Sequence, residues 1–213
     1  MLSFAWRDLR HGARSLWVFC ACLALGVALV AASGGLFRQV SDALLSDARA
    51  LLGGDLEVRA DAPLRPEELA WMRARGEVSL LIEMRTMLRT GDGRTQLVEL
   101  QSFDDAYPLY GEVALEPPSP LAAALAPRDG EWGAAIDRVV AERLGLRVGD
   151  RVHAGRVAAR VRAITLRQPD RSLRADWSGP PVLLSADALP ASGLIGPGSR
   201  VGYRYRVKTA EAP

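Results

Sequence analysis

The sequence predicts an α+β protein in which one amino-terminal transmembrane helix continues into a helical stalk and then a folded domain. The first observation is a run without any charged residue, Ser15 to Phe37. A helix over these roughly 23 residues would be about 35 Å long, enough to cross a hydrocarbon core of about 30 Å. The second observation is that apolar residues beyond Phe37 recur at helical spacing, and the third is that apolar and polar residues alternate, as in strands, after Gly54. With 24% charged and 49% hydrophobic residues in 213, the remainder suits a folded ectodomain.

The charges before the apolar run predict its orientation. Arg7, Arg10 and Arg14 make residues 1–14 a basic segment, and the whole chain has a formal net charge of only +2. Basic flanks stay in the cytoplasm, so we expect residues from about Arg38 onward to be periplasmic. A cleaved secretory signal is the alternative, since small residues at 30–33 offer a cleavage site. The apolar core is longer than the roughly 7 to 15 residues usual in a signal.

A helical stalk is predicted over residues 38–54. Its apolar stripe recurs every three to four residues, at Val40, Leu44, Ala48 and Leu51. Gly53 and Gly54 are expected to end it. The stripe packs either on its own domain or on a partner helix, and the pattern favours neither.

The first half of the ectodomain is predicted to contain a strand, a helix and two further strands, in that order. Residues 55–60 alternate as a strand does, and a helix beginning at Pro66 is expected to end at Gly76. Alternation over 78–88 and 95–103, joined by Asp92-Gly93, predicts a hairpin. Asp104-Asp105 could suggest acid–base chemistry, but a solvated turn is the better interpretation, since no nucleophile or histidine is nearby.

The second half begins after a proline-rich stretch at 107–130, where periodicity is lost and a subdomain junction is predicted. A short helix is expected over 134–144, ended by Gly145. Residues 146–164 predict a small β unit with a turn at Gly149-Asp150, and 167–179 a polar loop. Shorter elements lead to a final strand.

The final strand, beginning near Val201, alternates apolar with basic side chains. The basic ones are Arg200, Arg204, Arg206 and Lys208. They could face anionic lipid headgroups. The competing interpretation is a solvated face paired with Glu and Asp side chains of neighbouring strands, which deserves more weight.

No catalytic, cofactor or metal site is predicted. The chain has no nucleophile-elbow, phosphate-loop, zinc-protease or dinucleotide motif. Cys20 and Cys22 both lie in the apolar run, and His153 has no partner at metal-ligand spacing. The nearly neutral ectodomain also argues against nucleic acid as a partner.

Five segments in order resemble the FtsX-like, MacB-like permeases of ABC transporters. They are WRDLRHGARSLW, LLGGDLEVRADAPL, FDDAYPLYGEV, VVAERLGLRVGDRV and SGLIGPGSRVGYRYRV. Within the family they look most like the subfamily encoded beside a periplasmic lysophospholipase or thioesterase. The resemblance implies a two-lobed periplasmic core domain, with a mixed α/β lobe at 55–110 and 181–210 and an inserted β-rich lobe at 111–180.

The resemblance also implies function. Such a permease exports or extracts a hydrophobic or lipid-like substrate from the inner membrane, driven by a separate ATPase subunit whose motion is transmitted to the periplasm. Membrane lipid and a periplasmic esterase or thioesterase are further expected partners. Family members carry more membrane helices than the one predicted here, so the chain resembles an amino-terminal fragment, incomplete as a transporter. The alternative is a self-sufficient, membrane-anchored interaction or adaptor module.

Overall fold

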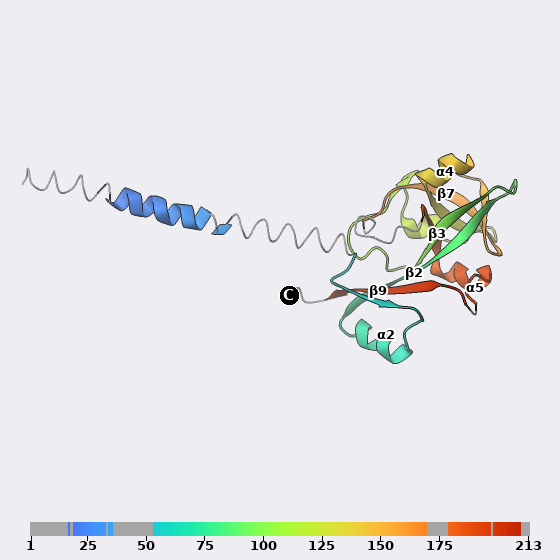
Figure 1. Cartoon of the computed structure of the whole chain (residues 1–213), viewed down its shortest axis with the longest axis horizontal. Helices are drawn as coiled ribbons and strands as arrows, with labels where there is room; N and C mark the ends of the chain where they lie inside the picture. Colours follow the sequence, from blue (N-terminus) through green and yellow to red (C-terminus); the bar gives the residue numbers. More distant parts are fainter. Residues whose placement is uncertain are drawn as a thin grey trace, which may run out of the picture. The chain divides into compact units, whose positions relative to one another are not determined.

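The structure is a computed structural model that describes residues 17, 19–32, 34–35, 53–169, 179–196 and 198–209. The chain divides into two units, Met1–Ala48 and Arg49–Pro213. The described residues of the first unit are helical (Figure 1). Among all described residues, no helix has both the length and the apolar character that crossing a membrane requires. The predicted transmembrane helix at 15–37 extends beyond the described residues and stays a prediction, as does the stalk, of which only Gly53 and Gly54 are described.

The described residues of the second unit, here called the core unit, mix strands with short helices, which confirms the predicted α+β class. The elements are β1 (Leu56–Ala60), α2 (Pro66–Arg73), β2 (Gly76–Thr90), β3 (Thr95–Phe103), β4 (Ala114–Glu116), α3 (Leu121–Leu125), β5 (Trp132–Asp137), α4 (Arg138–Leu144), β6 (Arg151–Ala154), β7 (Val157–Arg167), β8 (Pro181–Ser185), the 3₁₀ turn η1 (Ala186–Ala188), α5 (Leu189–Ser192) and β9 (Val201–Thr209). Figure 1 shows α2 and α4 at opposite ends of this unit.

The strands named above, all in the described part of the core unit, belong to one nine-stranded sheet. The order is β1-β9-β2-β3-β8-β5-β7-β4, and β6 pairs with both β2 and β7. Because β6 bridges these two strands, β2, β3, β8, β5, β7 and β6 form a closed ring. β3–β8 and β5–β7 are parallel, and the other pairs are antiparallel. Ring closure leaves those strands fewer free edges, as in a barrel.

The long strand β2 joins the ring to the rest of the sheet. Its first half, 76–84, pairs with β9, and its last residues, 88–90, pair with β6 on the same edge. The opposite edge pairs with β3 over 81–89. Strands from both predicted lobes therefore lie in one sheet, and the lobe boundaries themselves stay a prediction.

Side-chain alternation divides the interior into two apolar clusters. On β8, Val182 and Leu184 belong to the larger cluster, which also includes Met72 of α2 and Val140 of α4. Leu183, between them, belongs to the smaller cluster, which α3 covers. Alternate residues of a strand point to opposite faces, so both faces of β8 are buried.

The expected helix over 134–144 is wrong in its first part. Ala134, Ala135 and Ile136 lie in β5, between β7 and β8, and all three are fully buried. A strand covered on both faces has a continuous apolar run, which periodicity cannot separate from a buried helix. The helix α4 starts one residue after Asp137, whose carboxylate accepts a hydrogen bond from the Val139 N–H at 2.8 Å as an N-cap. Gly145, with φ 59°, ends α4 as predicted.

Two further expectations need correction. The stretch 107–130 is not without regular structure, since it holds β4 and α3. Gly76 does not end the preceding helix, because α2 stops at Arg73 and Gly76 is the first residue of β2. The predicted hairpin is confirmed as β2 and β3, with Gly93 in a left-handed conformation at its turn.

Candidate functional site: the charged face where the chain enters the core unit

Asp55 lies just before β1, near the start of the core unit, and its carboxylate holds three parts of the chain together. Asp55 Oδ2 accepts hydrogen bonds from Tyr110 OH at 3.0 Å, from the Thr209 N–H at 2.9 Å and from Thr209 Oγ1 at 3.0 Å. The Asp55 N–H in turn donates to the Val207 carbonyl at 2.8 Å. We call Asp55, Tyr110 and Thr209 the clasp. It ties the residue just before β1 to the last residue of β9.

The two glycines before Asp55 let the chain approach β9 closely. Gly53 has φ 70°, in the left-handed region. A Cβ on Gly54 would lie 3.1 Å from Arg206 Cβ and 3.3 Å from the Val207 carbonyl oxygen. The predicted end of the stalk therefore lies directly against the final strand.

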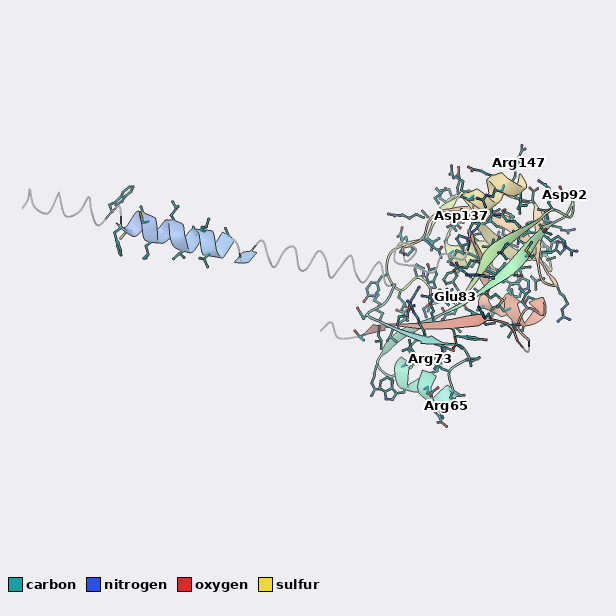
Figure 2. The ribbon with its side chains drawn as sticks, viewed as in Figure 1. Arg65, Arg73, Glu83, Asp92, Asp137 and Arg147 are labelled. Carbon is teal, nitrogen blue, oxygen red and sulfur yellow. The ribbon has the colours of Figure 1, made fainter. Side chains whose placement is uncertain are left out.

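Next to the clasp, ion pairs cross the three strands β1, β9 and β2. Glu57 contacts Arg206 Nε at 3.0 Å and Arg204 Nη1 at 3.3 Å. On the far side, Arg204 Nη2 lies 2.7 Å from Glu83 Oε1, and Figure 2 shows Glu83 beside β9. We call Glu57, Glu83, Arg204 and Arg206 the ion-pair ladder.

The ladder is nearly excluded from water. The side chains of Arg206, Arg204 and Glu57 are only 3%, 10% and 13% exposed. Burial by itself would raise the pKa of Glu57, but hydrogen bonds from Arg59 and Arg206 and the nearby positive charges outweigh it and lower that pKa. Glu57 is thus held ionised as the counter-charge of two buried guanidinium groups, which cannot stay unpaired in the interior.

Asp104 extends this polar face onto β2. Its carboxylate accepts hydrogen bonds from Ser79 Oγ at 2.9 Å and from the Leu80 N–H at 2.8 Å. Burial raises the pKa of Asp104, against the lowering effect of these two hydrogen bonds. The expectation of a solvated turn is therefore wrong for Asp104, while Asp105 is exposed.

The ladder also corrects the predicted headgroup face of the final strand. Arg204 and Arg206 are ion-paired to carboxylates of β1 and β2, as the competing interpretation expected, but they are buried, so the solvated face it expected is wrong for these two residues. Arg200 is exposed, and Lys208 is half-buried with its Nζ 5.1 Å from the centre of the Tyr110 ring. For these two residues the headgroup role stays a prediction.

The other predicted site residues lie outside the described residues. They are Arg7, Arg10 and Arg14 of the basic segment and Val40, Leu44, Ala48 and Leu51 of the stalk stripe.

Sequence reasoning missed Asp55, Glu57 and Tyr110. One signal was available, because Glu57 and Arg59 alternate on β1 as the arginines do on β9. The observed register places Glu57 opposite Arg206 and Arg59 opposite Arg204. Opposite charges directly across two strands are favourable, as in the pair Glu57 and Arg206, whereas Arg59 and Arg204 place like charges opposite each other. The pairing of these two strands, almost 150 residues apart, was not readable from local pattern.

The fold of the core unit is similar to that of known transporter domains. The structure resembles the periplasmic region of MacB from Actinobacillus actinomycetemcomitans, with a TM-score of 0.51 and 10% identity over 78% of this chain and 79% of that one. The extracellular domain of the ABC-type transporter YknZ from Gram-positive bacteria matches with a TM-score of 0.44 and 12% identity, over 69% of this chain and 74% of that one. The MacB match shows that the fold is that of a MacB-type periplasmic domain.

Sequence comparison adds one relative. The chain is 29% identical over 202 residues to YbbP, an ABC transporter permease of Escherichia coli K12. The match covers 94% of this chain but only 24% of that permease, so the chain spans about a quarter of its relative's length. No protein-family model matches the chain. The predicted resemblance to ABC transporter permeases is confirmed, whereas the subfamily beside a lysophospholipase stays a prediction.

Proposed function

We propose that this chain is a portion of the permease subunit of an ABC transporter in the bacterial inner membrane. Residues 1–14 lie in the cytoplasm, residues 15–37 cross the membrane and the core unit is periplasmic. The similarity to a permease over 94% of the chain supports this proposal, as does the MacB-type fold of the core unit. The chain has no catalytic role of its own, and ATP is hydrolysed by a separate subunit.

Within this proposal the core unit receives motion from the membrane helix by mechanotransmission. The single observation that supports this step is the clasp, which links the start of β1 to the end of β9 through one carboxylate. A displacement of the segment before Asp55 would then pull on β9 directly. The ion-pair ladder passes it on to β2, the strand that reaches into the ring.

The substrate we expect is hydrophobic or lipid-like, extracted from the inner membrane or exported. This rests on the resemblance of the whole chain to such permeases, and a periplasmic esterase or thioesterase would be a natural consumer of that substrate.

Labelling and cross-linking test the placement and the ATPase partner. Ala70, exposed on α2, is changed to cysteine in a chain whose Cys20 and Cys22 are serine. We expect a membrane-impermeant maleimide to label Ala70→Cys in intact spheroplasts, and cross-linking in membranes to recover an ABC ATPase with the chain. A chain protected from the reagent until the cells are lysed would contradict the periplasmic placement. A stable chain that recovers no ATPase would contradict the permease role.

A second test concerns the clasp. In membranes containing the chain and its co-purified ATPase, Asp55→Ala is expected to lower ATP hydrolysis at least about 5-fold, the low end of typical coupling between sites, while the complex stays assembled. The matched control is Asp61→Ala, which removes an exposed aspartate just after β1. An unchanged rate of ATP hydrolysis in Asp55→Ala would show that the clasp does not transmit motion. It would not contradict the permease proposal, which the labelling and cross-linking experiment tests separately.

A further inference from the structure

A cavity opens beside α3, and none of the clasp or ion-pair ladder residues is among the described residues that line it. Its volume is about 230 Å³, and its walls include Phe103, Tyr107 and Trp132 together with Asp104, Asp105 and Asp187. We call it the acidic pocket. It lies where β3 and β8 end, because Phe103 and Ser185 are the last residues of these parallel neighbours.

The charged side chains that the described residues place around the acidic pocket have one sign. Among the described residues that line it, none is basic. Asp105 and Asp187 are exposed, and neither forms an ion pair within the described part of the chain. Their carboxylates therefore give the mouth of the pocket a negative potential that no described lining side chain neutralises.

Two arginines described beside α3 are engaged with the backbone. Arg128 Nη2 donates to the Ala123 carbonyl at 3.0 Å, and Arg162 Nη2 donates to the Glu131 carbonyl at 3.3 Å, while Arg162 Nη1 donates to the Ala126 carbonyl. These guanidinium groups stabilise the carboxyl end of α3 by hydrogen bonds, and neither forms an ion pair with Asp105 or Asp187 among the described residues.

The walls of the pocket are aromatic and aliphatic. The rings of Phe103 and Tyr107 stack with centroids 3.8 Å apart, and Trp132 is half-buried. Leu121 and Leu125 of α3 add apolar surface. The faces of aromatic rings attract organic cations, and the aliphatic surface suits a carbon stem.

A metal ion fits this lining poorly. Among the described residues no group of three or more His, Cys, Asp or Glu side chains is positioned to hold one. The carboxylate of Asp104 is occupied by hydrogen bonds from β2. The volume is also below the roughly 300 Å³ at which pockets for whole drug-sized ligands begin, so the occupant is about the size of one side chain.

We propose that the acidic pocket binds an ammonium or guanidinium group carried on an apolar stem. The cation lies between Asp105 and Asp187 at the mouth, and the stem lies against Trp132 and the stacked Phe103 and Tyr107. The same chemistry is offered by a small organic amine and by a lysine or arginine side chain of a partner protein. The proposal does not depend on the permease function.

Fluorescence of Trp132 tests this proposal in the full chain. The other four tryptophans, Trp6, Trp17, Trp71 and Trp177, are changed to phenylalanine, and the chain is titrated in detergent micelles with benzylammonium. We expect saturable binding with a dissociation constant on the order of 1 mM, reasonable for so small a ligand. Benzyl alcohol, the neutral analogue, is expected to bind at least about tenfold more weakly, because it lacks the charge.

The carboxylates are tested by substitution. Asp105→Asn with Asp187→Asn is expected to weaken benzylammonium binding about tenfold and to leave benzyl alcohol unaffected. Asp61→Asn, an exposed carboxylate outside the pocket, is the matched control and should change neither. Thermal unfolding of each variant checks that the fold is kept. Equal binding of the two probes, or a double variant that binds benzylammonium as the unchanged chain does, would overturn the proposal.

A second probe separates the two sources of the cation. Nα-acetyl-arginine amide presents the guanidinium group as a polypeptide does. Tighter, Asp105- and Asp187-dependent binding of this probe supports the proposal with a partner protein as the source. Tighter, equally dependent binding of benzylammonium supports it with a small amine as the source.

Discussion

Replacing Glu57 with glutamine is expected to lower the free energy of unfolding of the full chain by about 3 kcal/mol. Glutamine keeps the size of the side chain but removes the negative charge that faces Arg204 and Arg206. Arg204 retains Glu83, whereas Arg206 has a side chain only 3% exposed and loses the counter-charge of Glu57. Removing one counter-charge of a buried charge costs far more than the net contribution of the pair. Urea unfolding in detergent micelles, followed by tryptophan fluorescence, measures the change.

Glu116→Gln is the control, because Glu116 pairs with Arg138 at 3.0 Å but both side chains are more than half exposed. It should cost less than about 1 kcal/mol. Equal losses of unfolding free energy in Glu57→Gln and Glu116→Gln would mean that burial of the ion-pair ladder does not add to the cost of removing Glu57.

The effect of Glu57→Gln should also depend on pH. The pKa of Glu57 is lower in the folded chain than in the unfolded one, so its stabilising effect is complete above the unfolded pKa. It is lost as the pH falls toward the folded pKa. The difference in unfolding free energy between the unchanged chain and Glu57→Gln should therefore shrink below the usual pKa of a glutamate, and a difference that widened there would contradict this assignment.

Replacing Gly76 with alanine is expected to cost about 3 kcal/mol, the upper part of the usual range for overpacking. A Cβ at this position would lie 2.1 Å from the Lys208 carbonyl oxygen and 3.0 Å from Thr209 Cα. Both are backbone atoms at the end of β9, so relief requires the two strands to separate beside the clasp. Thermal and urea unfolding of the full chain measure the loss.

Gly91→Ala is the matched control, since no atom lies within 4 Å of the Cβ it would add and its φ is not in the left-handed region. It should be neutral or slightly stabilising, because alanine restricts the unfolded chain. Similar results for Gly76→Ala and Gly91→Ala would mean that the strands yield to the added methyl at little cost.

The parts of the fold that local chemistry specifies were predicted correctly. Alternation and an Asp-Gly turn predicted the hairpin of β2 and β3, and Pro66 marked the start of α2. Gly145 marked the end of α4. Each of these signals acts within a few residues, so the amino-acid sequence contains each signal in full.

The failures share a different cause. β5 was expected to be helical because its burial on both faces depends on β7 and β8, which are distant in the chain. Gly76 was interpreted as a helix end because the strand that crowds it, β9, lies more than a hundred residues away. Asp104 was expected in solvent because its hydrogen-bond donors, Ser79 and the Leu80 N–H, belong to another strand.

The candidate site divides in the same way. The sequence alone established that Arg204 and Arg206 share one face of a strand, since a period of two requires it. It could not show whether that face meets water, lipid or carboxylates. Tertiary structure decided this by pairing β9 with both β1 and β2, which brings Glu57 and Glu83 against the two arginines and Thr209 against Asp55. Burial of a charge depends on what the rest of the chain places around it, and strand pairing across such separations leaves no local trace in the sequence.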